Sequence, residues 1–136
     1  MYYGEIHYYY ECDPGNIFRM HKRHNCGKPI YRRKCPEGKA IIDRQEVFIL
    51  DVRTNEEYAA GHINGSTLLA VQDIPEKELG EKLKEIPKDK KILVYCRSGS
   101  RSAKASRILA ENGFAMVYNM QGGITEWMNA GYEVEK

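Results

Sequence analysis

The sequence lacks a long hydrophobic run and has almost no excess of charge of either sign. No apolar stretch approaches the ~20 residues that a membrane-spanning helix needs. The 136 residues carry 21 basic and 19 acidic side chains, which leaves a formal net charge of +2. The first residues show neither the basic region nor the apolar core of a secretory leader. We therefore expect no membrane partner, and so small a net charge does not favour a nucleic-acid partner.

Cysteine is also scarce, with four residues in the chain. One of them lies in a reactive-looking loop, so this cysteine usage suits a reducing cytoplasm better than a disulfide framework. Internal repeats and low-complexity tracts are absent as well. The length is enough for one domain with a proper core and a small appendage.

Short apolar runs alternate with amphipathic stretches from about residue 30 onward. This alternation predicts an α/β domain over residues 30–136, with a parallel sheet of about five strands covered by helices on both faces. Residues 1–29 differ in composition and form a separate N-terminal extension. The expected strands are 47–52, 67–71, 92–95 and 115–118, and the expected helices are 36–45, 54–60, 76–86, 102–110 and 124–130.

The segment Cys96-Arg97-Ser98-Gly99-Ser100-Arg101 follows the apolar run 92–95 and precedes a predicted helix. A strand that delivers a cysteine into a short Gly/Ser loop before a helix is suited to holding an anion. The loop amides point inward and the helix N-terminus adds a partial positive charge. This field predicts a Cys96 thiolate with a pKa lowered from about 8.5 toward neutrality.

From about Tyr31 to Lys136 the chain resembles the rhodanese-like family of single-domain sulfurtransferases. Four groups of residues carry the resemblance, in the family's order and at its separations. Asn64 and Ser66 depart from the family pattern, where proline and alanine are usual. The four groups are Asp51-Val52-Arg53, then Glu57-Tyr58 with Gly61-His62-Ile63-Asn64-Gly65, then Cys96 to Arg101, and finally Gly122-Gly123-Ile124 with Trp127.

The resemblance implies a thiosulfate sulfurtransferase that works through a Cys96 persulfide. Thiosulfate or a persulfide would supply the sulfur, and a thiol or cyanide would accept it, with no cofactor. Arg101 is expected to face the anionic donor, whereas Arg97 either joins it or leans toward solvent. The implied substrate-binding residues are Arg97, Ser98, Gly99, Ser100 and Arg101.

Loop length separates this activity from a phosphatase of the same fold. The related phosphatases need a Cys-x5-Arg loop with room for a phosphate group. Here Arg101 is the fifth residue after Cys96, and the sixth is Ser102. The shorter loop therefore favours sulfur transfer over phosphatase activity.

Other polar residues are expected to be structural. Asp51 and Arg53 end a buried strand and predict an ion pair that braces neighbouring loops. His62 lies in a turn without a cysteine or acid partner in the sequence, which favours a structural role over that of a general base. Trp127 is expected in the core or at a pocket edge.

Residues 1–29 favour a β-hairpin that turns at residues 13–16. One alternative is a zinc site, because cysteine sulfur and imidazole nitrogen are zinc ligands. Cys35 can also be explained without zinc, because Cys35-Pro36-Glu37 occupies a helix-start position. Another alternative is that Cys12 or Cys26 receives sulfur from Cys96. The candidate metal ligands are Cys12, His21, Cys26 and Cys35, with His24 nearby.

A basic stretch between Pro14 and Pro36 holds seven basic residues and no acidic ones. It forms either a solvated surface or a contact for RNA or an acidic sulfur-carrier protein. The second interpretation makes the chain a persulfide carrier or a binding module in a sulfur relay. Retention of tRNA that weakens steeply as salt rises would indicate an RNA contact, whereas a solvated surface would retain none. The basic residues are Arg19, Lys22, Arg23, Lys28, Arg32, Arg33 and Lys34.

The hairpin interpretation predicts that the purified chain carries no zinc. Elemental analysis of the full chain, after dialysis against metal-free buffer, should find far less than one zinc per chain. A stoichiometry of about one zinc would contradict the hairpin and support the Cys/His ligand set.

Overall fold

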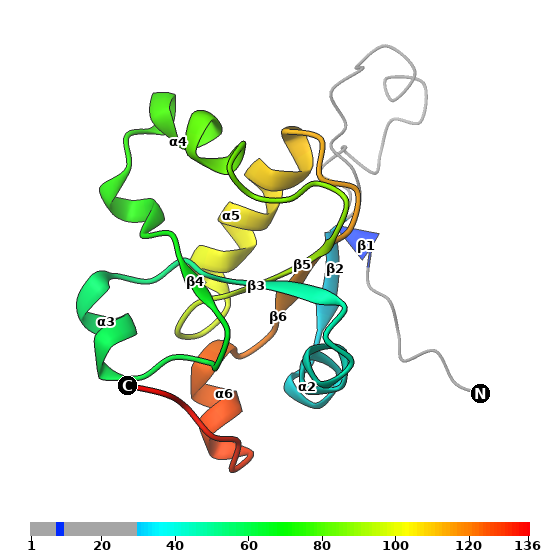
Figure 1. Cartoon of the computed structure of the whole chain (residues 1–136), viewed down its shortest axis with the longest axis vertical. Coiled ribbons are helices and arrows are strands. Elements are labelled where there is room, and N and C mark those ends of the chain that lie inside the picture. The colour runs from blue at the N-terminus through cyan, green and yellow to red at the C-terminus, as the bar shows by residue number, and fades with distance from the viewer. Residues whose placement is uncertain (1–7, 10–29) are drawn as a thin grey trace.

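A mostly parallel sheet with helices packed around it organises the structure (Figure 1). The computed structural model describes residues 8–9 and 30–136. The strand order is β1-β2-β6-β5-β3-β4. All neighbouring strands are parallel except β1, which runs antiparallel to β2. The strands are β1 (Tyr8–Tyr9), β2 (Ile30–Arg33), β3 (Val47–Asp51), β4 (Thr67–Leu68), β5 (Lys91–Tyr95) and β6 (Val117–Met120).

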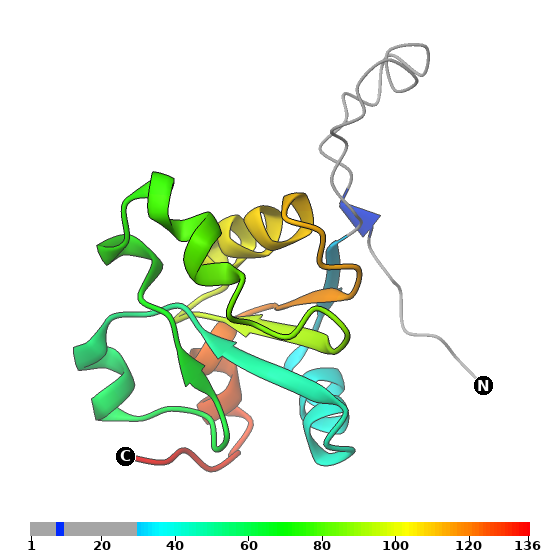
Figure 2. The ribbon, with the colours of Figure 1, turned by 45° about the horizontal axis from the view of Figure 1, so that its top comes forward.

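Helices cover both faces of the sheet, as parallel strands require. Figure 2 shows the green α4 and yellow α5 above the sheet and the cyan α2 and orange-red α6 below it. Among the described residues, no helix is long and apolar enough to cross a membrane. The helices are α2 (Cys35–Asp43), α3 (Asn55–Ala60), the 3-10 turn η1 (Val71–Asp73), α4 (Glu76–Leu83), α5 (Ser100–Glu111) and α6 (Gly123–Asn129).

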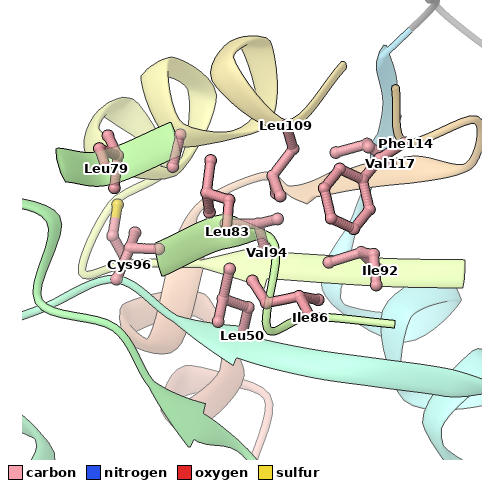
Figure 3. Packing of buried hydrophobic residues seen from close by; sticks show 12 residues of the cluster. Leu50, Leu79, Leu83, Ile86, Ile92, Val94, Cys96, Leu109, Phe114 and Val117 are labelled. Carbon is pink, nitrogen blue, oxygen red and sulfur yellow. The ribbon is translucent and has the colours of Figure 1, made fainter. Parts of the chain in front are cut away.

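The central strand β5 divides the core into two clusters. Its Ile92 and Val94 are fully buried and belong to the cluster beneath α4 and α5, which also holds Cys96 (Figure 3). Its Leu93 and Tyr95 are equally buried in the cluster on the opposite face. This strict period of two is the pattern of a strand buried on both faces.

The α/β fold with helices on both faces is confirmed, but two strand predictions need correction. The strand predicted at 115–118 lies at 117–120. It includes Asn119, because β5 and β2 bond it from both sides and override the low strand propensity of asparagine. The strand predicted at 67–71 is limited to Thr67–Leu68, since it pairs only with β3 before the chain turns into η1.

Most of the predicted N-terminal hairpin lies outside the described residues and stays a prediction. The described pair Tyr8 and Tyr9 forms β1, which lies along β2 in antiparallel register with Tyr31 and Ile30. This two-residue strand therefore adds to the β2 side of the sheet.

The expected ion pair between Asp51 and Arg53 is confirmed. Arg53 Nη2 lies 2.6 Å from Asp51 Oδ2, and Arg53 Nε donates to the same carboxylate. Arg53 Nη2 also donates to the carbonyl of Gly61 at 2.7 Å. Both side chains are almost fully buried, so the pair ties the end of β3 to the turn that follows α3.

The turn after α3 has structural partners of its own. Tyr95 Oη accepts from the Ile63 amide at 3.1 Å and donates to Ser66 Oγ at 3.2 Å. His62 stacks on Tyr58 with ring centroids 3.8 Å apart and pairs with the Tyr58 carbonyl through Nδ1. These contacts support the structural role expected for His62. Its Nε2 also lies 3.6 Å from a Glu135 carboxylate oxygen, a partner that the sequence did not suggest.

Arg53→Leu should destabilise the fold by about 3–5 kcal/mol, because it leaves the buried Asp51 carboxylate without its cation. Urea unfolding followed by circular dichroism measures the loss. Arg44→Leu is the matched control, since Arg44 is exposed and its loss should change stability by no more than about 0.5 kcal/mol. Equal effects of the two substitutions would contradict the bracing role.

Candidate active site

Strand β5 brings Cys96 to the carboxyl edge of the sheet, where parallel α/β folds bind ligands. The side chain is fully buried. Figure 3 shows its sulfur pointing toward Leu79 of α4, on the α4 and α5 face. The thiol therefore lies beneath the start of α5 and within the larger hydrophobic cluster.

Helix α6 determines the direction of the loop's peptide groups. The Ile124 amide donates to the Cys96 carbonyl at 2.9 Å, and Thr125 donates to the Arg97 carbonyl through its amide and its hydroxyl. In a trans peptide the N–H points away from the C=O. The Ser98 amide is therefore turned from α6 toward the sulfur, and the Gly99 amide donates to Cys96 Sγ at 3.1 Å.

Two glycines allow α6 to come this close. Gly123 has a φ of +58°, and a Cβ at this position would lie 2.3 Å from the Cys96 carbonyl oxygen. The preceding Gly122 also has a positive φ, of +75°. Only glycine combines this backbone conformation with so short an approach. The Gly122-Gly123 pair therefore lets α6 contact the cysteine loop on the side away from the sulfur.

Hydrogen bonding lowers the pKa of the Cys96 thiol. Burial alone would raise this pKa, but the Ser102 hydroxyl and the amides of Ser102, Gly99 and Ser98 favour the thiolate and hold the pKa below its usual value. The lowered pKa agrees with the sequence prediction.

Ser102 and Asn119 form a second layer around the sulfur. Ser102 Oγ lies 3.4 Å from Cys96 Sγ and 2.6 Å from Asn119 Oδ1. Asn119 Nδ2 donates to the Gly99 carbonyl at 3.3 Å. Ser102 Oγ also lies 3.1 Å from the Gly99 carbonyl. Because a hydroxyl has one proton, Ser102 can donate to only one of the sulfur, Asn119 and Gly99. Asn119 therefore competes with the sulfur for this proton.

Arg101 lies at the start of α5 and is paired with Glu57 of α3. Its Nη1 and Nη2 donate to the two carboxylate oxygens of Glu57 at 2.8 and 2.9 Å. The pair holds the pKa of Glu57 at about 2, mainly through the Arg101 hydrogen bond. Glu57 also accepts from the Thr54 amide at 3.0 Å, in the capping box of α3. The guanidinium therefore has its charge compensated before any ligand binds.

The remaining loop residues divide between the sulfur and solvent. Ser98 and Gly99 contribute amides, whereas the side chains of Arg97, Ser98 and Ser100 are exposed. Arg97 contributes through its carbonyl, which α6 holds. Of the two orientations considered for the Arg97 side chain, the structure has the outward one.

Cys35 lies apart from this site, at the start of α2. Its thiol is buried with Sγ 3.6 Å from the Gly123 carbonyl and 3.7 Å from the Gln121 carbonyl. Burial raises its pKa, as does the charge of Glu126. The other members of the alternative zinc set, Cys12, His21 and Cys26, lie outside the described residues.

Three contributing residues were missed by the sequence analysis in their site roles. Glu57 was noted in the Glu57-Tyr58 group of the family resemblance, and nothing local indicates Arg101 as its partner. Ser102 was noted for its spacing from Cys96, not as a hydrogen-bond donor. Asn119 was hidden in an apolar strand, although an asparagine at such a position is itself a sign of a buried polar contact.

Comparisons with known proteins identify relatives of this chain. The family model described as a rhodanese-like domain matches residues 35–130. A sulfurtransferase from Allochromatium vinosum is 36% identical over 71% of this chain and 86% of its own length. A tRNA uridine(34) hydroxylase from Cytophaga hutchinsonii is 39% identical over 67% of this chain, which spans only 29% of that protein.

A solved structure carries the same fold. The crystal structure of a rhodanese-related protein from Thermoplasma volcanium aligns with a TM-score of 0.64 at 35% identity, covering 76% of this chain and 96% of that one. With the family model matching well over half of its length, the chain belongs to the rhodanese-like domain family.

Proposed function

We propose that the protein transfers sulfane sulfur from an anionic donor to a thiol or cyanide through a Cys96 persulfide. The observation that carries this proposal is the buried Cys96 sulfur, which accepts the Gly99 amide at 3.1 Å and has a lowered pKa. A thiolate is the nucleophile that this chemistry needs.

In the first step the Cys96 thiolate attacks the outer sulfur of thiosulfate. The S–S bond of the donor breaks, sulfite leaves with the electron pair, and a Cys96 persulfide anion remains. In the second step the acceptor attacks the terminal sulfur, and the Cys96 thiolate leaves. Both resting forms are anions, so the amides of Ser98 and Gly99 support each of them without a proton transfer.

The start of α5 complements this chemistry. Its first N–H groups lack partners within the helix and carry a partial positive charge. Ser102 lies in the first turn of α5 and reaches the sulfur. The proposed reaction therefore needs no separate base, because the thiolate forms in the resting protein.

Cys96→Ser should abolish thiosulfate:cyanide sulfurtransferase activity and leave the fold intact by circular dichroism. Intact mass after incubation with thiosulfate should show a gain of one sulfur atom in the unmodified chain only. Cys35→Ala is the matched control, a buried cysteine outside the site that should keep both activity and sulfur loading. A Cys96→Ser protein that retains most of its activity would disprove the assignment of the nucleophile.

The rate of Cys96 alkylation by iodoacetamide should rise with pH, with a midpoint below the ~8.5 of an ordinary thiol. The lowered pKa means that the thiolate already dominates where a free cysteine is still protonated. Mass spectrometry of the Cys96 peptide against pH measures the profile. A midpoint at or above that of free cysteine would argue against the amide support.

Arg101→Ala should raise the KM for thiosulfate and leave kcat nearly unchanged. The substitution removes a cation and also leaves the Glu57 carboxylate without its partner beside the anionic donor. The expected fall in kcat/KM is about ten- to a hundred-fold, the effect of a charge-assisted hydrogen bond. Arg101→Lys should recover part of it, because an ammonium cannot reproduce the planar fork. An unchanged KM in Arg101→Ala would remove Arg101 from donor binding.

A further inference from the structure

A cavity of about 220 Å³ lies beside Arg101, between the η1–α4 segment and α5. It is on the same face of the sheet as the Cys96 thiol, whose sulfur points toward Leu79, one of the cavity's walls (Figure 3). The Cys96 side chain packs in one hydrophobic cluster with these walls. The lining includes Val71, Ile74, Leu79, Arg101, Lys104 and Ile108.

The walls of this cavity are mostly aliphatic, and Gln72 adds one uncharged polar residue to the lining. Val71, Ile74 and Ile108 are only partly buried, so they present apolar surface to whatever occupies the space. An engineered cavity of roughly 150 Å³ with aliphatic walls holds a benzene molecule. The present volume therefore suits a ligand with a small apolar body, a part that thiosulfate lacks.

The charges at the rim select for a single negative charge. Arg101 is bound through both Nη atoms by Glu57, and the two side chains together carry no net charge. Lys104 follows three residues later on α5 and is exposed, with no ion pair among the described residues. One uncompensated cation at an apolar cavity complements a monoanion, whereas the Glu57 carboxylate disfavours a dianion such as thiosulfate.

We propose that this cavity binds the organic body of a monoanionic sulfane-sulfur donor and so sets the donor preference of the Cys96 site. The inference rests on the proposed function and names its donor class, an organic thiosulfonate or an equivalent donor with an apolar group. The Cys96 thiolate attacks the sulfane sulfur, the S–S bond of the donor breaks, and the organic sulfinate leaves with the electron pair. A Cys96 persulfide anion remains, so atoms and charge balance.

Two donors with the same reactive group test the cavity. Benzenethiosulfonate and methanethiosulfonate carry one charge each and differ in the ring, and cyanide serves as the acceptor for both. With the full chain, kcat/KM should be at least about tenfold higher for the benzene donor, the discrimination expected of a hydrophobic pocket. Equal values for the two donors would overturn the proposal.

Ile74→Asn should reduce this benzene-to-methane ratio to near one, because it places an amide in the cavity wall. Ile42→Asn is the matched control, a partly buried isoleucine packed against the cluster on the opposite face of the sheet. The ratio is insensitive to a general loss of folded protein, so a destabilised variant still reports on the cavity. A ratio that Ile74→Asn leaves unchanged would place the ring elsewhere and overturn the proposal.

Glu57→Gln tests the charge argument by a gain of activity, because removing a negative charge should make thiosulfate a better donor. It keeps an oxygen for the α3 cap and removes the negative charge, so kcat/KM for thiosulfate should rise several-fold relative to methanethiosulfonate. Lys104→Gln should weaken both organic donors through KM, and Lys90→Gln, an exposed lysine before β5, should leave them unaltered. A thiosulfate value that does not rise in Glu57→Gln would overturn the charge selection.

Intact mass separates failure of this inference from failure of the proposed function. If Cys96 gains a sulfur from all three donors without a preference for the ring, sulfur transfer stands and the cavity assignment falls. If Cys96 gains no sulfur from any of them, the proposed function falls and the cavity assignment falls with it.

Discussion

The anion site depends on one constraint: the carbonyls of Cys96 and Arg97 point toward α6, away from the sulfur. Helix α6 meets these carbonyls with the amides of Ile124 and Thr125, donors that a helix start leaves without partners of its own. Since the peptide group between Arg97 and Ser98 is planar, fixing the Arg97 oxygen on one side presents the Ser98 amide on the other, toward the sulfur. The Gly122-Gly123 pair makes this docking possible, so the chemistry of one loop is determined by a helix that follows it much later in the chain.

The thiolate is supported by dipoles at contact distance more than by full charges. Amides and one hydroxyl surround the sulfur, while Arg101 has Glu57 as its counter-ion. Hydrogen bonds inside a buried site are screened little by salt, whereas interactions between exposed charges fade over a Debye length of about 8 Å at physiological ionic strength. The loop amides thus support the anion directly, while the full charges of Arg101 and Glu57 are paired with each other.

Most of the fold follows from local patterns in the sequence. The capping box of Thr54 and Glu57 places the start of α3, and the apolar runs of β3 and β5 identify the central strands. The pairing of Asp51 with Arg53 is also local, because the two residues are neighbours at one strand end. The cysteine loop with its lowered pKa was predictable for the same reason, since strand, loop and helix adjoin in the sequence.

The remaining features of the site depend on long-range contacts. Glu57 and Arg101 are 44 residues apart in the sequence, and only the folded arrangement of α3 and α5 brings the two side chains together. Asn119 reaches Ser102 because β6 lies beside β5, and neither residue is informative alone. Register also decided the limits of β6, where pairing on both sides extended the strand beyond its apolar run.

The position of β1 bears on how copies of the protein behave toward one another. Strand β2 would present a row of open backbone groups at the margin of the sheet, and such margins recruit strands from other molecules. Tyr8 and Tyr9 occupy part of that row in antiparallel register. Tyr8 and Tyr9 thus cover part of the β2 edge that a strand from a second copy could otherwise pair with.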